Sequence, residues 1–259
     1  MKGVLQRHPF AVEARFERCC ALTFAVPVES VARRLPPPLV PDAFEGRWGF
    51  LAVAVVQTRA LRPAGWPVWA GQDFLLVGYR LFARYRSGSG RNLRGLFILR
   101  SETDRWRMAW LGNLFTGYRY VHSDLAITTD RTGWGVDAPA GGLRIRIDPG
   151  AGEPVALPDG SPFRDWREAR RFSGPMPFTF SVAEAGREVV IVEGVHPEWN
   201  PRPVRVLEHR VPFLEAQGFG GAVLANAFEV GQVAYRWKRG RVERRLESPV
   251  EMGGDVTGA

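Results

Sequence analysis

The chain has 259 residues, of which 45% are hydrophobic and 24% are charged, and this balance excludes a disordered or collagen-like protein. Its two cysteines, Cys19 and Cys20, are adjacent in sequence, which excludes a disulfide framework and suits a reducing compartment. The net charge is +8, but no nucleic-acid-binding motif accompanies it, and no apolar run is long enough to cross a bilayer. We therefore expect a cytoplasmic protein whose partners include neither nucleic acid nor a membrane.

Short apolar runs broken by glycine and proline recur along the whole chain, and no linker or repeat divides it. This pattern predicts a single, mainly β domain over residues 1–259, of the sandwich or barrel type. The segment 143–148 alternates strictly, so Leu143, Ile145 and Ile147 should share one buried face. The expected strands are 15–24, 48–58, 74–86, 93–100, 118–128, 143–148, 188–193 and 222–237.

A few short helices are expected among these strands, over 28–35, 105–115 and 161–174. The first should end at Pro36, because three consecutive prolines cannot continue a helix. The second has Thr103 or Asp104 as its N-cap. Helical spacing predicts that this second helix is largely enclosed, with one face formed by Trp106, Ala109, Trp110, Asn113 and Leu114.

Two segments of the chain carry a family resemblance. Residues 34–47 read RLPPPLVPDAFEGR after a short helix, and residues 112–120 read GNLFTGYRY after another helix. This order of helix, proline stop and strand resembles the YqjF-like family, an uncharacterised bacterial branch of the acetoacetate decarboxylase-like superfamily. The resemblance implies a closed β-barrel with a ligand cavity.

The same resemblance bears on the reaction. In acetoacetate decarboxylase one lysine forms a Schiff base with the keto acid and a second lysine lowers its pKa. The resemblance places Tyr118 and Arg119 at these positions, and neither a phenol nor a guanidinium can form an imine. The two lysines of the chain, Lys2 and Lys238, lie at the N-terminus and in an arginine-rich segment. Schiff-base decarboxylation is therefore not expected.

Candidate site residues lie on the strand expected over 118–128. Its period of two places Tyr118, Tyr120 and His122 on one face and Arg119 on the other. Facing a cavity, these groups could orient a polar ligand or move a proton, with Tyr118 and His122 as the candidate acid and base. The alternative is that the tyrosines pack locally and His122 lies at the surface.

The remaining candidate ligand-binding residues lie before this strand. The resemblance places an acidic cavity residue near Asp73 and a family tyrosine at Tyr79. Asp73 beside Arg119 would form a charge pair able to hold a polar ligand, unless Asp73 lies in an exposed turn. Trp110 and Asn113 complete the set, although Asn113 could equally cap the end of its helix.

We expect from these residues a protein that binds a small, carboxylate-type organic ligand without Schiff-base chemistry. No cofactor is expected, and the four histidines show no paired spacing for a metal. One alternative is a lyase or hydratase acting on an oxo acid, with Tyr118 or His122 as acid or base and Arg119 as anion anchor. Another is an interaction protein that uses an arginine-rich hairpin from Arg236 to Arg245. The sequence leaves open whether the protein forms a homo-oligomer.

Overall fold

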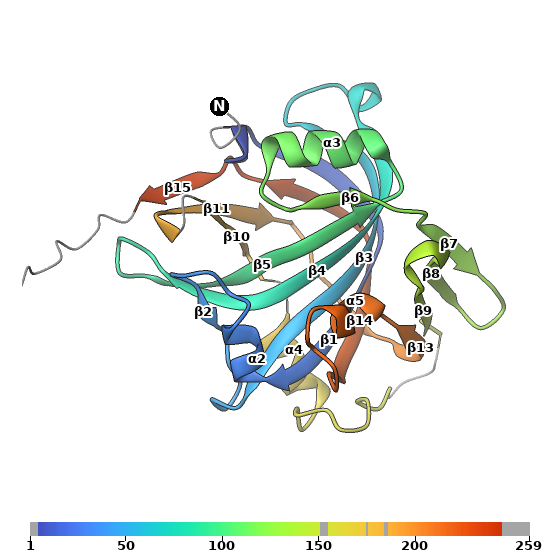
Figure 1. Cartoon of the computed structure of the whole chain (residues 1–259). Coiled ribbons are helices and arrows are strands. Elements are labelled where there is room, and N and C mark those ends of the chain that lie inside the picture. Colours follow the sequence, from blue (N-terminus) through green and yellow to red (C-terminus); the bar gives the residue numbers. More distant parts are fainter. Residues whose placement is uncertain (1–4, 151–154, 175, 184–185, 245–259) are drawn as a thin grey trace, which may run out of the picture.

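The computed structural model describes residues 5–150, 155–174, 176–183 and 186–244 (Figure 1). The described strands form an 11-stranded sheet and a 4-stranded sheet, which confirms the mainly β fold. The larger sheet contains β1 (Val12–Pro27), β2 (Val40–Pro41), β3 (Trp48–Pro63), β4 (Gln72–Arg86), β5 (Asn92–Thr103), β6 (Tyr120–His122), β10 (Phe178–Ala183), β11 (Glu188–Val195), β12 (Arg202–Pro203), β14 (Val223–Trp237) and β15 (Arg241–Arg244). The smaller sheet contains β7 (Ala126–Thr129), β8 (Trp134–Ala138), β9 (Leu143–Asp148) and β13 (Arg205–Arg210).

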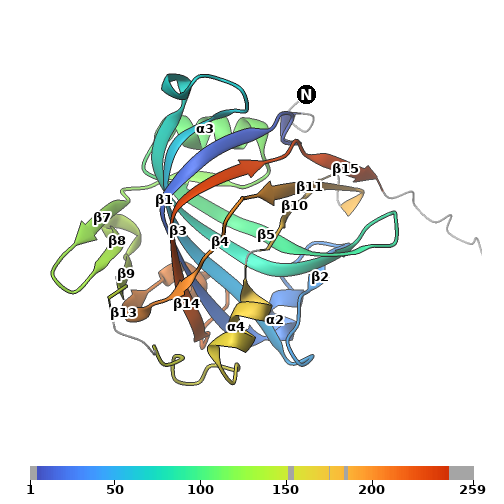
Figure 2. The same cartoon turned by 180° about the vertical axis from the view of Figure 1, so that it is seen from behind.

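The strand pairings of the larger sheet close into a ring. The hydrogen-bonded order runs β14, β1, β3, β4, β5, β10 and β11, and β11 then pairs with β14 through Gly194 and Trp237. A closed ring protects strand edges that would otherwise pair with other chains. Figures 1 and 2 show a helix toward each end of the ring, α3 (Trp106–Phe115) and α4 (Trp166–Ser173). Among the described helices, none has the length and apolar character needed to cross a membrane.

One face of the ring carries the main hydrophobic core. Large side chains such as Leu22, Val53 and Leu81 are fully buried there. They pack against the smaller sheet, α2 (Val28–Ala32) and α5 (Pro212–Ala216). The strand β9 contributes Leu143, Ile145 and Ile147 to this core, as its strict alternation predicted.

The expected strand over 118–128 is wrong as a single strand. The chain forms β6 in the larger sheet, next to β5, and then β7 in the smaller sheet, next to β8. Arg119 has a left-handed backbone (φ 54°), so the extended chain begins only at Tyr120. One segment thus serves two sheets, which a period of two cannot reveal.

The expected enclosure of the helix over 105–115 is also wrong. Trp106 and Trp110 are 67% and 62% exposed, whereas Met108, Ala109 and Gly112 are buried. The ring of Tyr120 occupies the space where a Cβ on residue 112 would stand, so the helix turns its glycine toward the sheet. The buried face of this helix is therefore the one whose backbone can come close to the sheet at Gly112, and it is not the face that the spacing of apolar residues predicted.

The expectation of an arginine-rich hairpin from Arg236 to Arg245 is wrong as well. β14 and β15 do not pair with each other; both pair with β11, Arg236 opposite Val195 and Arg241 opposite Ile191. Arg245 lies outside the described residues. Several cations of this segment are paired with acids, including Lys238 with Glu193 at 3.0 Å. The strands β14 and β15 thus pair with successive parts of β11 and do not form a hairpin with each other.

Candidate functional site

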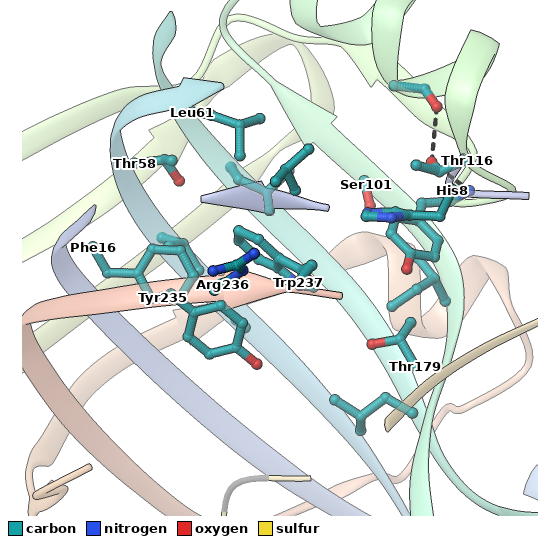
Figure 3. A pocket seen from close by; sticks show the side chains of 18 of the residues that line it. His8, Phe16, Thr58, Leu61, Ser101, Thr116, Thr179, Tyr235, Arg236 and Trp237 are labelled. Atoms are coloured by element: carbon teal, nitrogen blue, oxygen red, sulfur yellow. Dashed lines mark hydrogen bonds between the residues drawn. The ribbon is translucent and has the colours of Figure 1, made fainter. Parts of the chain in front are cut away.

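A large cavity lies on the other face of the ring. Its volume is about 890 Å³, and residues of β1, β3, β4, β5, β10 and β14 line it, together with α3 and the segment before β1. Figure 3 shows His8, Ser101 and Thr116 gathered at one side of this space, with Tyr235 and Trp237 projecting from β14. Strands from most of the ring therefore form the walls of the cavity.

Small side chains create much of this space. Ala52 and Ala54 of β3 face the cavity between buried large residues of the opposite face. The neighbours of Ala54 in register are also small, since it pairs with Ala21 of β1 and with Gly78 of β4. The walls at this level are therefore formed by backbone and methyl groups, which leaves room for larger groups to enter.

Within the described residues three arginines line the cavity, Arg62, Arg80 and Arg236. Arg236 is exposed, whereas Arg80 of β4 is partly buried. Its Nε is buried without a hydrogen-bond partner, and its side chain forms no ion pair with the described residues. Its guanidinium folds back over Gly78, where a Cβ would stand 2.8 Å from Nε. Neither Asp nor Glu is found among the described residues that line the cavity. Arg62, a second cation of the lining, is paired with Glu13 at 2.7 Å.

Three tyrosines surround this charge. Burial raises the pKa of Tyr120 and of Tyr235 to about 12, and it raises the pKa of Tyr118 further still. The positive charge of Arg80 opposes the rise in all three, which places the guanidinium within electrostatic reach of each phenol. The Tyr118 hydroxyl has Thr179 nearby but makes no hydrogen bond of ordinary geometry within the described structure. At neutral pH these phenols are therefore hydrogen-bond donors.

His8 supplies a base to the same cavity. The residue is 6% exposed, and its Nδ1 has no hydrogen-bond partner in the described part of the chain. Its backbone is fixed by Phe115, whose carbonyl accepts from the His8 amide at 2.9 Å, and by Gly240, whose amide donates to the His8 carbonyl at 2.8 Å. Burial lowers the pKa of His8 to about 4, so the imidazole is neutral at pH 7.

The structure brings two of the predicted site residues into the cavity, Tyr118 and Tyr120. Arg119 points away, and its guanidinium lies 5.4 Å from the centre of the Phe97 ring. His122 is exposed and lies outside the cavity lining. Of the predicted common face of residues 118, 120 and 122, the two tyrosines line the cavity, whereas His122 ends β6 beyond the cavity lining.

The other predicted residues lie elsewhere. Asp73 is exposed and accepts hydrogen bonds from Arg59 at 3.0 Å and from the Ala60 amide at 2.8 Å, so it forms no pair with Arg119. Tyr79 is buried in the main core, on the face opposite to Arg80, with its ring 4.2 Å from that of Phe213.

The two predicted residues of α3 lie on its outer side. Trp110 is exposed and outside the cavity lining. Asn113 brackets the backbone of Tyr120, accepting from its amide at 2.7 Å and donating to its carbonyl at 2.8 Å. Asn113 therefore positions a residue of the cavity lining without itself lining the space.

Sequence reasoning missed Arg80, His8 and Tyr235. A signal existed for Arg80, because it is the one charged residue between Phe74 and Ala83 in an apolar strand. Nothing in the sequence marked His8, which reaches the cavity through contacts with residues more than a hundred positions away. Within the described structure no lysine lines the cavity, and no cluster of His, Cys, Asp and Glu could hold a metal.

Residues 13–239 match the model of the DUF2071 family, described as an uncharacterized conserved protein. A search of curated protein sequences found no significant match.

Several solved structures share the fold at low sequence identity. The enduracididine biosynthesis enzyme MppR complexed with pyruvate superposes with a TM-score of 0.57 at 13% identity, covering 90% of each chain. An acetoacetate decarboxylase-like enzyme from Sphingomonas wittichii RW1 gives 0.54 at 12% identity, covering 92% of this chain and 94% of that one. Acetoacetate decarboxylase from Legionella pneumophila subsp. pneumophila str. Philadelphia 1 gives 0.54 at 10% identity, covering 89% and 87%. The expected acetoacetate decarboxylase-like fold is confirmed.

Proposed function

Because this chain belongs to the DUF2071 family and has the fold of acetoacetate decarboxylase, we propose that its cavity binds a small organic anion of the carboxylate type. The observation that carries this proposal is the unpaired guanidinium of Arg80 among apolar walls. A lysine Schiff base has no part in it, since the one described lysine, Lys238, is paired with Glu193 outside the cavity.

The physical argument concerns the cost of an unpaired charge. A cation that leaves water loses hydration, and that loss is offset when an anion takes the place of water. Hydrogen bonds to a charged group contribute about 1.5–3 kcal/mol each, roughly twice the value for neutral pairs. The neutral phenols of Tyr118, Tyr120 and Tyr235 add donors and no negative charge. The site therefore favours an anion over a neutral or cationic molecule.

The test compares a carboxylate with the alcohol of equal carbon number. Calorimetric titration of the purified protein with hexanoate and with hexanol should show tighter binding of hexanoate, by about tenfold or more. Arg80→Met keeps a side chain of similar length and should abolish that preference. Arg33→Met, at an exposed arginine beside α2, serves as the matched control and should leave it unchanged. Equal binding of acid and alcohol by the unmodified protein would reject the proposal.

A second candidate function is an acid–base enzyme of the lyase or hydratase type acting on an oxo acid. The observation that favours it is the presence of two unpaired groups in one cavity, the hydroxyl of Tyr118 and Nδ1 of His8. A neutral imidazole can accept a proton and a neutral phenol can donate one. His8 takes in this scheme the part first assigned to His122, and Arg80 takes that of Arg119.

Proton exchange separates the enzyme from the binder. Pyruvate in D₂O, followed by proton NMR, should lose its methyl signal faster with the protein than without it, and Tyr118→Phe or His8→Gln should remove most of the acceleration. Binding of pyruvate without accelerated exchange would reject acid–base catalysis for this probe and leave the anion-binding function in place.

A further inference from the structure

The size of the cavity limits the kind of anion that fills it. Cavities that enclose drug-sized molecules measure about 300–1,000 Å³. The value here, about 890 Å³, lies near the upper end of that range. An acid of three or four carbons bound at Arg80 would leave most of this space to water against apolar walls, at a cost in free energy.

Several polar groups of the cavity lie at one level of the ring. The guanidinium of Arg80 folds over Gly78, and Gly78 pairs in register with Ser101 of β5. Ser101 pairs in turn with Tyr120 of β6. The cation, a hydroxyl and a phenol thus occur side by side on three neighbouring strands, which defines where a carboxylate would be held.

Apolar side chains dominate one side of this level. The next cavity-facing positions are Leu76 of β4, which pairs with Val56 of β3, and Phe74, which pairs with Thr58. Met108 and Leu111 of α3 line the same cavity. Trp66 also lines it and is 59% exposed, so the cavity reaches the surface beside the connection between β3 and β4.

Aromatic packing backs the other side of the polar level. Phe82 and Leu96 face the cavity there, and behind them Phe50 stacks on Phe163 with ring centres 5.3 Å apart. Ser173, Gly174 and Met176, at and after the end of α4, also line the cavity. A ligand held at Arg80 has an apolar path available toward Trp66, where the cavity reaches the surface.

We propose that the ligand is an extended apolar acid, an alkyl or arylalkyl carboxylate, with its carboxylate at Arg80 and its tail along the path lined by Leu76, Val56 and Leu111 toward Trp66. This inference rests on the proposed anion-binding function and names the class of ligand. The tail removes apolar surface from water, which supplies affinity, while Arg80 and the phenols fix the orientation.

The test is a chain-length series. Calorimetric titration with straight-chain carboxylates from acetate to decanoate, each below its micelle concentration, should show affinity rising about fourfold per added methylene. The rise should level off once the tail reaches the surface at Trp66. A flat series, or pyruvate binding as tightly as octanoate, would overturn the inference.

Variants locate the tail. Leu76→Gln and Leu111→Gln each place a polar group on the proposed path and should weaken decanoate binding about tenfold while changing butyrate binding less than twofold. Leu207→Gln is the matched control, because Leu207 is 47% exposed on β13 and lies outside the cavity lining. Thermal unfolding of each variant confirms that it is folded. Equal losses for both acids would overturn the assignment of this path.

The two proposals fail in different ways. If octanoate and octanol bind the unmodified protein equally, the anion-binding function fails, whatever the effect of chain length. If carboxylates are preferred over alcohols but chain length has no effect, anion binding stands and the extended apolar ligand is rejected. Arg80→Met should keep the chain-length dependence and lose the preference for acid over alcohol.

Discussion

The two faces of β4 differ sharply over a few residues. Tyr79 and Leu81 point into the main core and are at most 1% exposed, and Tyr79 packs on α5. Arg80 lines the cavity, with its guanidinium over Gly78, and has no ionic partner among the described residues. The same division holds on β3, where Val53 is buried in the core while its neighbours Ala52 and Ala54 line the cavity.

This comparison shows how the fold provides a cavity without losing stability. The core face buries large aliphatic and aromatic groups, which supply most of the hydrophobic free energy. The cavity face is therefore free to carry small residues, an unpaired cation and unpaired hydroxyls, each of which costs stability. The stabilising core and the proposed binding site thus lie on opposite sides of the same strands, and substitutions on each side should have separable effects.

The largest expected difference compares two adjacent leucines of β4. Leu75 lies in the main core and Leu76 lines the cavity. Leu75→Ala should lower the free energy of unfolding by about 3 kcal/mol, because it opens a void in a packed core. Leu76→Ala should cost about 1 kcal/mol or less, since its side chain already borders open space. Urea denaturation measures both values, and similar losses would contradict the division into two faces.

The next effect concerns pH and His8. Its pKa, about 4, lies below the ordinary 6.5, so between these values the unfolded chain binds a proton that the folded chain does not. Stability should therefore fall as the pH drops from about 6.5 toward 4, by roughly 2–3 kcal/mol from this group.

His8→Gln removes the titrating group and should flatten that part of the pH profile of thermal unfolding. His122→Gln, at an exposed histidine outside the cavity, is the control and should leave the profile unchanged. An identical profile for His8→Gln and the unmodified protein would contradict the burial of a neutral His8.

A smaller effect is expected at Gly78, and it should appear in binding. A methyl group there would stand 2.8 Å from the Arg80 Nε, the end of a side chain that can move aside. Gly78→Ala should therefore change stability little and weaken hexanoate binding about tenfold, equivalent to about 1.4 kcal/mol.

Gly95 offers the opposite control. A Cβ at this position would collide with the backbone carbonyl of Phe178, which cannot move aside. Gly95→Ala should lower the melting temperature and leave the preference of the folded protein for hexanoate over hexanol intact. A Gly78→Ala variant with unchanged hexanoate affinity would show that the position of Arg80 does not matter.

The smallest expected changes in stability concern two tyrosines, one in the main core and one in the cavity lining. Tyr85, in the main core, donates to Glu243 at 2.8 Å, and Tyr85→Phe should cost about 1 kcal/mol of stability. Tyr118 has an unpaired hydroxyl, so Tyr118→Phe should change the free energy of unfolding by less than about 0.5 kcal/mol. The latter variant should instead weaken hexanoate binding several-fold. Chemical denaturation measures the loss of stability in each variant, and calorimetry measures the loss of hexanoate binding.

Much of the fold could be predicted from local patterns. The strict alternation of 143–148 predicted β9 with its bounds, and long apolar runs predicted the central parts of β1, β3, β4, β5 and β14. The strands β8, β10 and β13 were missed, because short segments rich in polar or small residues resemble loops. The α4 helix begins at Trp166, later than predicted, because the Asp165 side chain caps it by accepting from the Glu168 amide at 2.7 Å.

The candidate site was predictable only in part. Tyr118 and Tyr120 were identified and do line the cavity, whereas Asp73, Arg119 and His122 lie outside it. An apolar run such as that of β4 places apolar residues on both faces of the strand. The sequence therefore cannot show which face meets the core and which meets a cavity. The sequence shows Arg80 within an apolar strand. Its role as a candidate anion-binding group became apparent only because no acidic residue is found in the described cavity lining.

By itself the sequence determined most of the long strand-forming segments, the burial of Cys19 and Cys20, and the scarcity of lysine, which occurs only as Lys2 and Lys238. These follow from composition and from interactions between residues close along the chain. The tertiary structure alone decided that His8 meets Phe115, that Ser101 lies beside Tyr120, and that α3 turns its tryptophans outward. These contacts depend on how the ring closes, and closure is set by packing between distant segments, which no local period encodes.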